Sequence, residues 1–206
     1  THIAIARQPN ANIIAKAKYA LFNPSVGFKA IYRFTSRQKG ASNTLNHLPD
    51  ICGEDPKLVH YKLHTVEHHL AHIASAYYLS PFEKLTAGFS YDGSGDFASA
   101  MAARCEGSRI SVLDKVTVPN SLGHFYTAMC QFIGFDLFGE EYKVMGLAPY
   151  GEDNFSIEME KILEVEDGGW FKLNDKYFTI SRGFRDAQFS DDQQMRLRSE
   201  EHTSEL

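Results

Sequence analysis

The stretch Val66–Asp96 constrains this chain more than any other, because it places two sets of candidate ligands close together. Its first part, EHHLAHIASAYY, has apolar residues at three- and four-residue spacing, which predicts a helix over Glu67–Tyr78. On that helix His68 and His72 lie one turn apart on the same face, whereas His69 points about 100° away. Two imidazoles at this spacing can bind one divalent cation, although histidines also occur as ordinary polar residues where a helix begins.

The second part of the stretch predicts a β-hairpin. Leu85–Ser90 and Phe97–Ala103 are typical of strands, so Tyr91–Asp96 is expected to form the turn between them. A third strand at Arg109–Val118 follows another glycine-containing turn. Together these segments predict a three-stranded antiparallel meander.

The predicted turn, with the sequence YDGSGD, supplies further candidate site residues. Asp92 and Asp96 are candidate catalytic residues, since a carboxylate in such a turn can bind a metal or orient a hydroxyl near a phosphate. Gly93 and Gly95 are candidate cofactor contacts, because positive φ at glycine lets the backbone approach a ligand closely. The alternative is a purely structural turn, because Asp and Gly are also the residues that tight hairpins prefer.

The remaining elements follow from periodicity and from turn residues. Before the histidines we expect a helix at Asn10–Phe22, a second helix and a loop in Ser25–Asn46, a connector at Asp50–Pro56 and a strand at Leu58–Val66. After the meander we expect a helix from the N-cap Ser121 to Ile133, an amphipathic helix at Asn154–Glu164, and a hairpin over Gly169–Ile180 that turns at Asn174-Asp175, with Trp170 and Phe171 in the core.

The segment Gly139–Gly151 contains three glycines and a proline, which predicts a loop of fixed shape. Lys143 lies in this segment and is a candidate contact for a phosphate or carboxylate of a cofactor. An exposed lysine without a ligand is the alternative. His124, in the preceding helix, is expected to be a structural rather than a catalytic residue.

Composition excludes two classes of partner. The 206 residues carry a formal net charge of −5, which provides no broad basic surface for nucleic acid. No apolar run approaches the roughly 18 residues that a membrane helix needs. Three widely spaced cysteines without a CxxC pair predict reduced thiols in a cytoplasmic protein.

Both ends of the chain suggest a fragment. Residue 1 is Thr rather than Met, and the chain opens inside an apparently running segment, so we expect the natural N-terminus to be missing. At the other end Arg198–Leu206 reads RSEEHTSEL, which resembles the translation of a sequencing adapter. A hydrophilic natural tail is the alternative.

Four motifs in a fixed order give the chain a family resemblance. They are EHHLAH, SYDGSGD, the helix start LGHFY and KVMGLAPYG. With them the segment Lys57–Phe178 resembles the N-terminal domain of the carbamoyltransferases of the nodulation and antibiotic-biosynthesis type. The resemblance implies an α/β fold with mixed sheets, part of the superfold of actin, sugar kinases and heat-shock ATPases, incomplete at both ends. Residues 1–80 would be the remainder of a first subdomain and residues 81–197 the start of a second, with the boundary near Ser80–Lys84.

The resemblance also implies an activity. Carbamoyl phosphate and ATP would be substrates that give carbamoyl-adenylate in a C-terminal domain absent here, and the present domain would transfer the carbamoyl group to a hydroxyl of a small-molecule acceptor. His68 and His72 would hold a divalent metal, iron or zinc, completed by an aspartate further along the full protein. A homodimer is a further expectation.

Rival interpretations come from other classes. A relative of the tRNA threonylcarbamoyl-transferases would share the histidine pair and the superfold. A sugar-kinase-like ATPase would share the hairpin but does not need the histidines. In a non-catalytic module, His68 and His72 would hold a structural zinc or mediate a subunit contact, and no nucleotide would bind.

Overall fold

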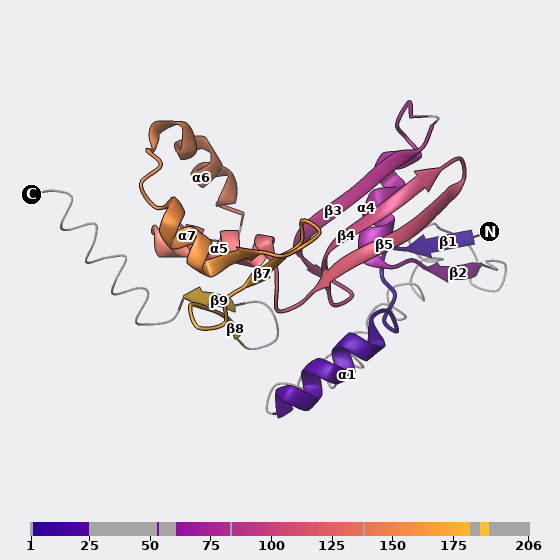
Figure 1. The fold of residues 1–206 in the computed structure, drawn as a ribbon. Helices are drawn as coiled ribbons and strands as arrows, with labels where there is room; N and C mark the ends of the chain where they lie inside the picture. The colour runs from indigo at the N-terminus through magenta and orange to yellow at the C-terminus, as the bar shows by residue number, and fades with distance from the viewer. Residues whose placement is uncertain are drawn as a thin grey trace, which may run out of the picture.

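The structure is a computed structural model that describes residues 2–24, 53, 61–82, 84–137, 139–181 and 186–189 (Figure 1). It combines helices with parallel and antiparallel strand pairs, which confirms the expected mixed α/β class. The relation to the actin superfold stays a prediction. The elements expected in Ser25–Asn46, most of the connector after them and the tail from Arg198 lie outside the described residues.

The N-terminal part contains a strand that the sequence did not predict. β1 (His2–Ile5) pairs in parallel with β2 (Lys62–Thr65), with His2 opposite Lys62. α1 (Ile13–Phe22) follows β1 and lies within the predicted helix. β2 confirms the second half of the predicted strand and leads directly into the helix that carries the histidines.

That helix and the meander form the central part of the molecule. The elements are α4 (His68–Tyr77), β3 (Thr86–Gly95), β4 (Ala98–Glu106) and β5 (Arg109–Thr117). The three strands form one antiparallel sheet in the order β3-β4-β5, and Figure 1 shows α4 against one of its faces. The predicted meander and histidine helix are therefore confirmed.

The core of this part lies between α4 and β4. Ile73 and Tyr77 of the helix pack against Met101, Ala103 and Cys105 of the strand, and all five are buried. Full burial of one such large apolar side chain stabilises the fold by about 1.5–3 kcal/mol. This core joins elements on either side of the predicted subdomain boundary, and the division itself stays a prediction.

The turn of the first hairpin lies later than predicted. β3 continues through Gly95, which pairs with Ala98, and a bulge after Tyr91 accommodates the additional residues. The turn itself is Asp96-Phe97, with φ of 50° and 76°. Positive φ at both central residues is what a two-residue hairpin turn with the right twist requires. The prediction that Tyr91–Asp96 forms the turn, with positive φ at its glycines, is therefore wrong.

The C-terminal part has a separate core. Its elements are α5 (Leu122–Phe132), α6 (Glu141–Leu147), the 3₁₀-helix η1 (Ala148–Tyr150), α7 (Ser156–Ile162), β6 (Leu163–Val165), β7 (Phe171–Leu173), β8 (Phe178–Ser181) and β9 (Asp186–Phe189). Ala128 of α5, Ile162 at the end of α7, Leu173 and Phe178 form the buried cluster. α5 thus confirms the predicted helix and connects this core to β3.

Three predictions in the C-terminal part are wrong. Gly139–Gly151 is not a loop: the chain forms α6 and η1 there, and Gly146 lies inside α6 without positive φ. The hairpin predicted over Gly169–Ile180 does not form, because β7 pairs with β6 and β8 pairs with β9. Trp170 is only half-buried, and its ring stacks on Phe89 with centroids 5.9 Å apart.

Two further observations concern the described residues. Cys105 and Cys130 are buried free thiols, and burial raises the pKa of each. Cys52 lies outside the described residues, and the expectation of reduced cysteines stays a prediction. None of the described helices combines the length and the apolar character needed to cross a membrane.

Candidate metal centre

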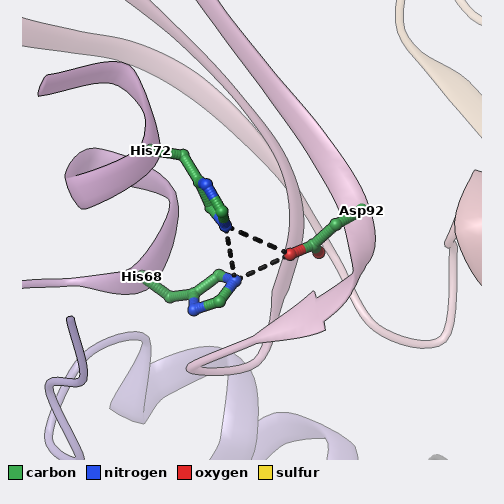
Figure 2. Close-up of side chains that lie close together, drawn as sticks. All are labelled: His68, His72 and Asp92. Atoms are coloured by element: carbon green, nitrogen blue, oxygen red, sulfur yellow. Dashed lines mark hydrogen bonds and ion pairs between the residues drawn. The ribbon is translucent and has the colours of Figure 1, made fainter. Parts of the chain in front are cut away.

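Three predicted site residues converge between α4 and β3. Figure 2 shows His68 and His72 pointing from the helix toward Asp92 on the strand. The Nε2 atom of His68 lies 2.7 Å from Asp92 Oδ2 and 3.1 Å from the Nε2 atom of His72, which in turn lies 3.7 Å from that oxygen. His68 and Asp92 are about 30% exposed and His72 is half-exposed, so the cluster opens to solvent. All of the candidate ligand atoms lie within 4.8 Å of one another.

The first turn of α4 is held by two carboxylates. Glu67 is the N-cap, and its Oε2 accepts a hydrogen bond of 2.8 Å from the backbone N–H of Leu70. Asp96 Oδ2 accepts hydrogen bonds from the backbone N–H groups of His68 and Gln8, at 3.1 and 2.6 Å. The contacts to Leu70 and His68 satisfy N–H groups of the first helical turn, which have no partner within the helix. Asp96 therefore braces the start of α4 and does not face the cluster, unlike Asp92.

The glycines of β3 provide space rather than unusual backbone angles. A Cβ atom on Gly95 would lie 2.0 Å from the ring of His68, so the imidazole occupies the volume that a side chain would fill. A Cβ atom on Gly93 would lie 3.3 Å from the ring of His124. Gly95 therefore makes room for His68 of the cluster, and Gly93 makes room for His124. Their role as cofactor contacts stays a prediction.

His69 lies beneath the cluster and is fully buried. Its Nδ1 atom lies 2.9 Å from Ser90 Oγ, and its Nε2 atom lies 3.4 Å from Asp92 Oδ1. Helix geometry predicted that His69 points away from His68 and His72, and its ring lies against the other carboxylate oxygen of Asp92. The alternation of β3 could have revealed this contact, because Ser90 and Asp92 point to the same face of the strand, whereas Phe89 and Tyr91 are exposed.

α5 approaches the same end of β3 from the other side. Ser121 is the N-cap, as predicted: its Oγ atom accepts the N–H of His124 at 3.1 Å and donates toward the carbonyl oxygen of Gly93 at 2.6 Å. The Nε2 atom of His124 lies 3.3 Å from Ser94 Oγ. Burial lowers the pKa of His124, and the negative charge of Asp92 partly offsets this effect.

Lys143 is not part of the cluster. It lies on α6, at the end of the molecule away from α4 in Figure 1. Its Nζ atom lies 2.6 Å from Glu140 Oε1, and the hydrogen bond to this carboxylate raises the pKa of Lys143. The prediction that Lys143 contacts a cofactor remains open.

The donor set suits a transition metal. Two imidazole nitrogens and one carboxylate oxygen, with further positions open to solvent, are typical of catalytic zinc and of non-haem iron sites. Magnesium and calcium prefer an all-oxygen set, which this cluster does not offer. The residues present therefore fit the iron or zinc that the family resemblance implies.

Comparisons with known proteins relate this chain to one protein family. A family model described as the carbamoyltransferase N-terminus matches residues 30–201. The nodulation protein NolO of Bradyrhizobium diazoefficiens is 38% identical over 110 residues, which are 53% of this chain and 20% of that protein. NolNO of Sinorhizobium fredii is 38% identical over 109 residues, 52% of this chain and 16% of that protein. An uncharacterised Synechocystis protein is 36% identical over 118 residues, 57% of this chain and 19% of that protein. The chain thus spans about a fifth or less of the length of these relatives.

Proposed function

Because this chain belongs to the carbamoyltransferase N-terminus family, we propose that its His68, His72 and Asp92 form the metal centre of an enzyme that transfers a carbamoyl group to a hydroxyl of a small molecule. The observation that carries the proposal is the convergence of three candidate ligands, two imidazoles and one carboxylate, from α4 and β3. The family membership suggests the reaction class, and the three-residue cluster is the site at which we propose that the metal binds.

The contacts suggest different roles for the two candidate catalytic residues, Asp92 and Asp96. Asp96 already accepts two backbone N–H groups, so we assign it a structural role at the start of α4. Asp92 directs Oδ2 toward both histidines, which suits a ligand. The additional aspartate expected further along the full protein would complete the coordination.

A divalent cation held there would supply Lewis-acid polarisation of the carbamoyl carbonyl or would orient a phosphate of the carbamoyl donor. The chain's own residues orient the ligand His68. Gly95 leaves the space that the His68 ring occupies, and Glu67 caps the helical turn that carries this ring. The donor would be carbamoyl-adenylate, made from carbamoyl phosphate and ATP elsewhere in the complete protein.

The first test is zinc or iron binding by this chain. We expect one ion per chain in the wild type and none in a His68→Ala, His72→Ala double variant. The matched control is His2→Ala, His64→Ala, which removes another contacting imidazole pair whose nitrogens lie 2.7 Å apart. Equal metal content in the wild type and in the site variant, or a loss only in the control, would contradict the proposed centre.

The second test uses the complete protein. Carbamoyl phosphate and ATP should be consumed only when the metal is bound, and the double variant should be inactive. Metal binding without any nucleotide binding by the complete protein would favour a structural zinc and overturn the transferase proposal.

A further inference from the structure

The buried histidine beneath the cluster has a role that the three ligands do not explain. His69 is 0% exposed, and burying a polar ring costs free energy unless its nitrogens find partners. Its Nδ1 atom contacts Ser90 Oγ, but among the described residues its Nε2 atom and Asp92 Oδ1 are both buried without a hydrogen-bond partner. These two atoms face each other at 3.4 Å.

The surroundings of the ring select one tautomer. If Nδ1 carried the proton, the lone pair of Nε2 would face the Asp92 carboxylate in a buried place, which is unfavourable. If Ser90 donates its hydroxyl proton to Nδ1, then Nε2 carries the proton and points it at Asp92 Oδ1. A hydrogen bond of ordinary length, about 2.9 Å, then requires an approach of only a few tenths of an ångström.

We infer that His69 is a positioning residue of the metal centre: its Nε2–H holds Asp92 Oδ1, so that Oδ2 stays turned toward His68 and His72. The inference rests on the proposed function. Carboxylate ligands of metals are themselves held by hydrogen bonds from groups that do not touch the ion, and the loss of such a partner typically lowers metal affinity about 10–100-fold. Here one helix turn supplies both the ligand His68 and the support His69.

The experiment compares two substitutions of His69. One can keep the contact to Asp92, and the other can keep only the contact to Ser90. The amide of Gln reaches the place of Nε2 and can donate to Asp92, whereas the shorter Asn reaches only the place of Nδ1 near Ser90. We expect His69→Gln to bind Zn²⁺ nearly as the wild type does, and His69→Asn to bind it about 10–100-fold more weakly. Affinity is measured on the full chain by competition with a chelating dye, and the Co²⁺ absorption spectrum reports a changed ligand field in His69→Asn.

Ile73→Val is the matched control. Ile73 lies one turn further along α4 and is buried, but its partners are apolar residues of β4. This substitution is expected to lower stability by about 0.5–1.5 kcal/mol and to leave Zn²⁺ affinity unchanged. It separates general loosening of the core from loss of the contact to Asp92.

A measurement on the metal-free chain tests the geometry independently. The ¹⁵N shifts of the His69 ring should show that Nε2 carries a proton, and a ring with its proton on Nδ1 alone would overturn the inference. If the wild type binds Zn²⁺ through His68 and His72 while His69→Asn binds equally well, the inference fails and the proposed centre stands. If the wild type binds no metal, both fail.

Discussion

Helices α4 and α5 both place their first turn against the same end of β3, but they contact different parts of it. α4 meets the side chain of Asp92 through His68 and His69, at 2.7 and 3.4 Å. α5 meets the main chain, because the Ser121 hydroxyl donates toward the carbonyl oxygens of Asp92 and Gly93. The Ser121 hydrogen bonds hold the main chain of the strand, whereas the α4 contacts gather several candidate ligand atoms around one side chain. We therefore expect α5 to support the position of β3 and α4 to form the metal centre with it. Substitutions at the α5 contact should lower stability, and substitutions at the α4 contact should lower metal affinity.

The largest effect on stability is expected at Gly123 of α5. A Cβ atom there would lie 2.5 Å from the backbone nitrogen of Gly93 and 2.6 Å from the carbonyl carbon of Asp92. Since backbone atoms cannot move aside as a side chain can, Gly123→Ala must push α5 away from β3. Overpacking of this kind costs about 1–3 kcal/mol, which a urea unfolding curve measures.

Gly146→Ala is the control for the change from glycine to alanine. Gly146 lies within α6, and a Cβ atom there meets nothing within 4 Å. Alanine favours a helix over glycine, so this variant should be as stable as the wild type or slightly more stable. If Gly123→Ala unfolds at the same urea concentration as Gly146→Ala, the close contact between α5 and β3 is not a support of the fold.

A smaller effect on stability, but a specific effect on metal, is expected at Gly95. Its added Cβ atom would overlap the Cγ and Cδ2 atoms of His68, each at 2.0 Å, and would lie 2.6 Å from Cβ. The imidazole must therefore leave its place beside Asp92. We expect Gly95→Ala to lower Zn²⁺ affinity about 10–100-fold, as other changes that misorient a ligand do. Unchanged affinity would mean that His68 binds the ion from another position or does not bind it.

Local pattern was sufficient to predict the elements on both sides of this comparison. Apolar spacing predicted the helix that carries His68 and His72, and a serine before an apolar run predicted the N-cap of α5. Neither signal depends on distant residues. Asp92 was a candidate because of the YDGSGD motif, whose predicted turn was misplaced, and the structure places it against the histidine pair.

What the sequence could not provide are contacts between segments far apart in the chain. The glycines of YDGSGD predicted a turn with positive φ. In the structure the absence of a side chain at these positions instead leaves room for His68 and His124, which pack against them from other elements. The pairing of β1 with β2 joins strands about 60 residues apart, for which no local signal exists. Gly139–Gly151 has the composition of a loop, yet α6 and η1 cover most of it, because local sequence preference is weak and is readily overridden by contacts with the rest of the chain. His69 was set aside by helix geometry alone, since its partner lies on a strand.

The smallest effect concerns His124 of α5. Burial lowers the pKa of His124 in the folded chain, with the Asp92 charge as a partial offset. The folded chain therefore binds a proton at His124 less readily than the unfolded chain does. Its contribution to stability is fully present above the ordinary pKa of 6.5 and is lost as the pH falls from there through the lower pKa of the folded state.

A comparison of the wild type with His124→Asn isolates this contribution. Urea midpoints are measured from about pH 8 to about pH 5, the range in which histidine changes its charge, with a chelator present to remove metal. The α4 histidines remain in both proteins, so their titration cancels in the difference. We expect the wild type to lose more stability than His124→Asn on acidification, by less than either glycine substitution costs. A difference that does not change with pH would show that the His124 imidazole meets the same environment in the folded and unfolded chains. In that case α5 would brace β3 through Ser121 and the backbone alone.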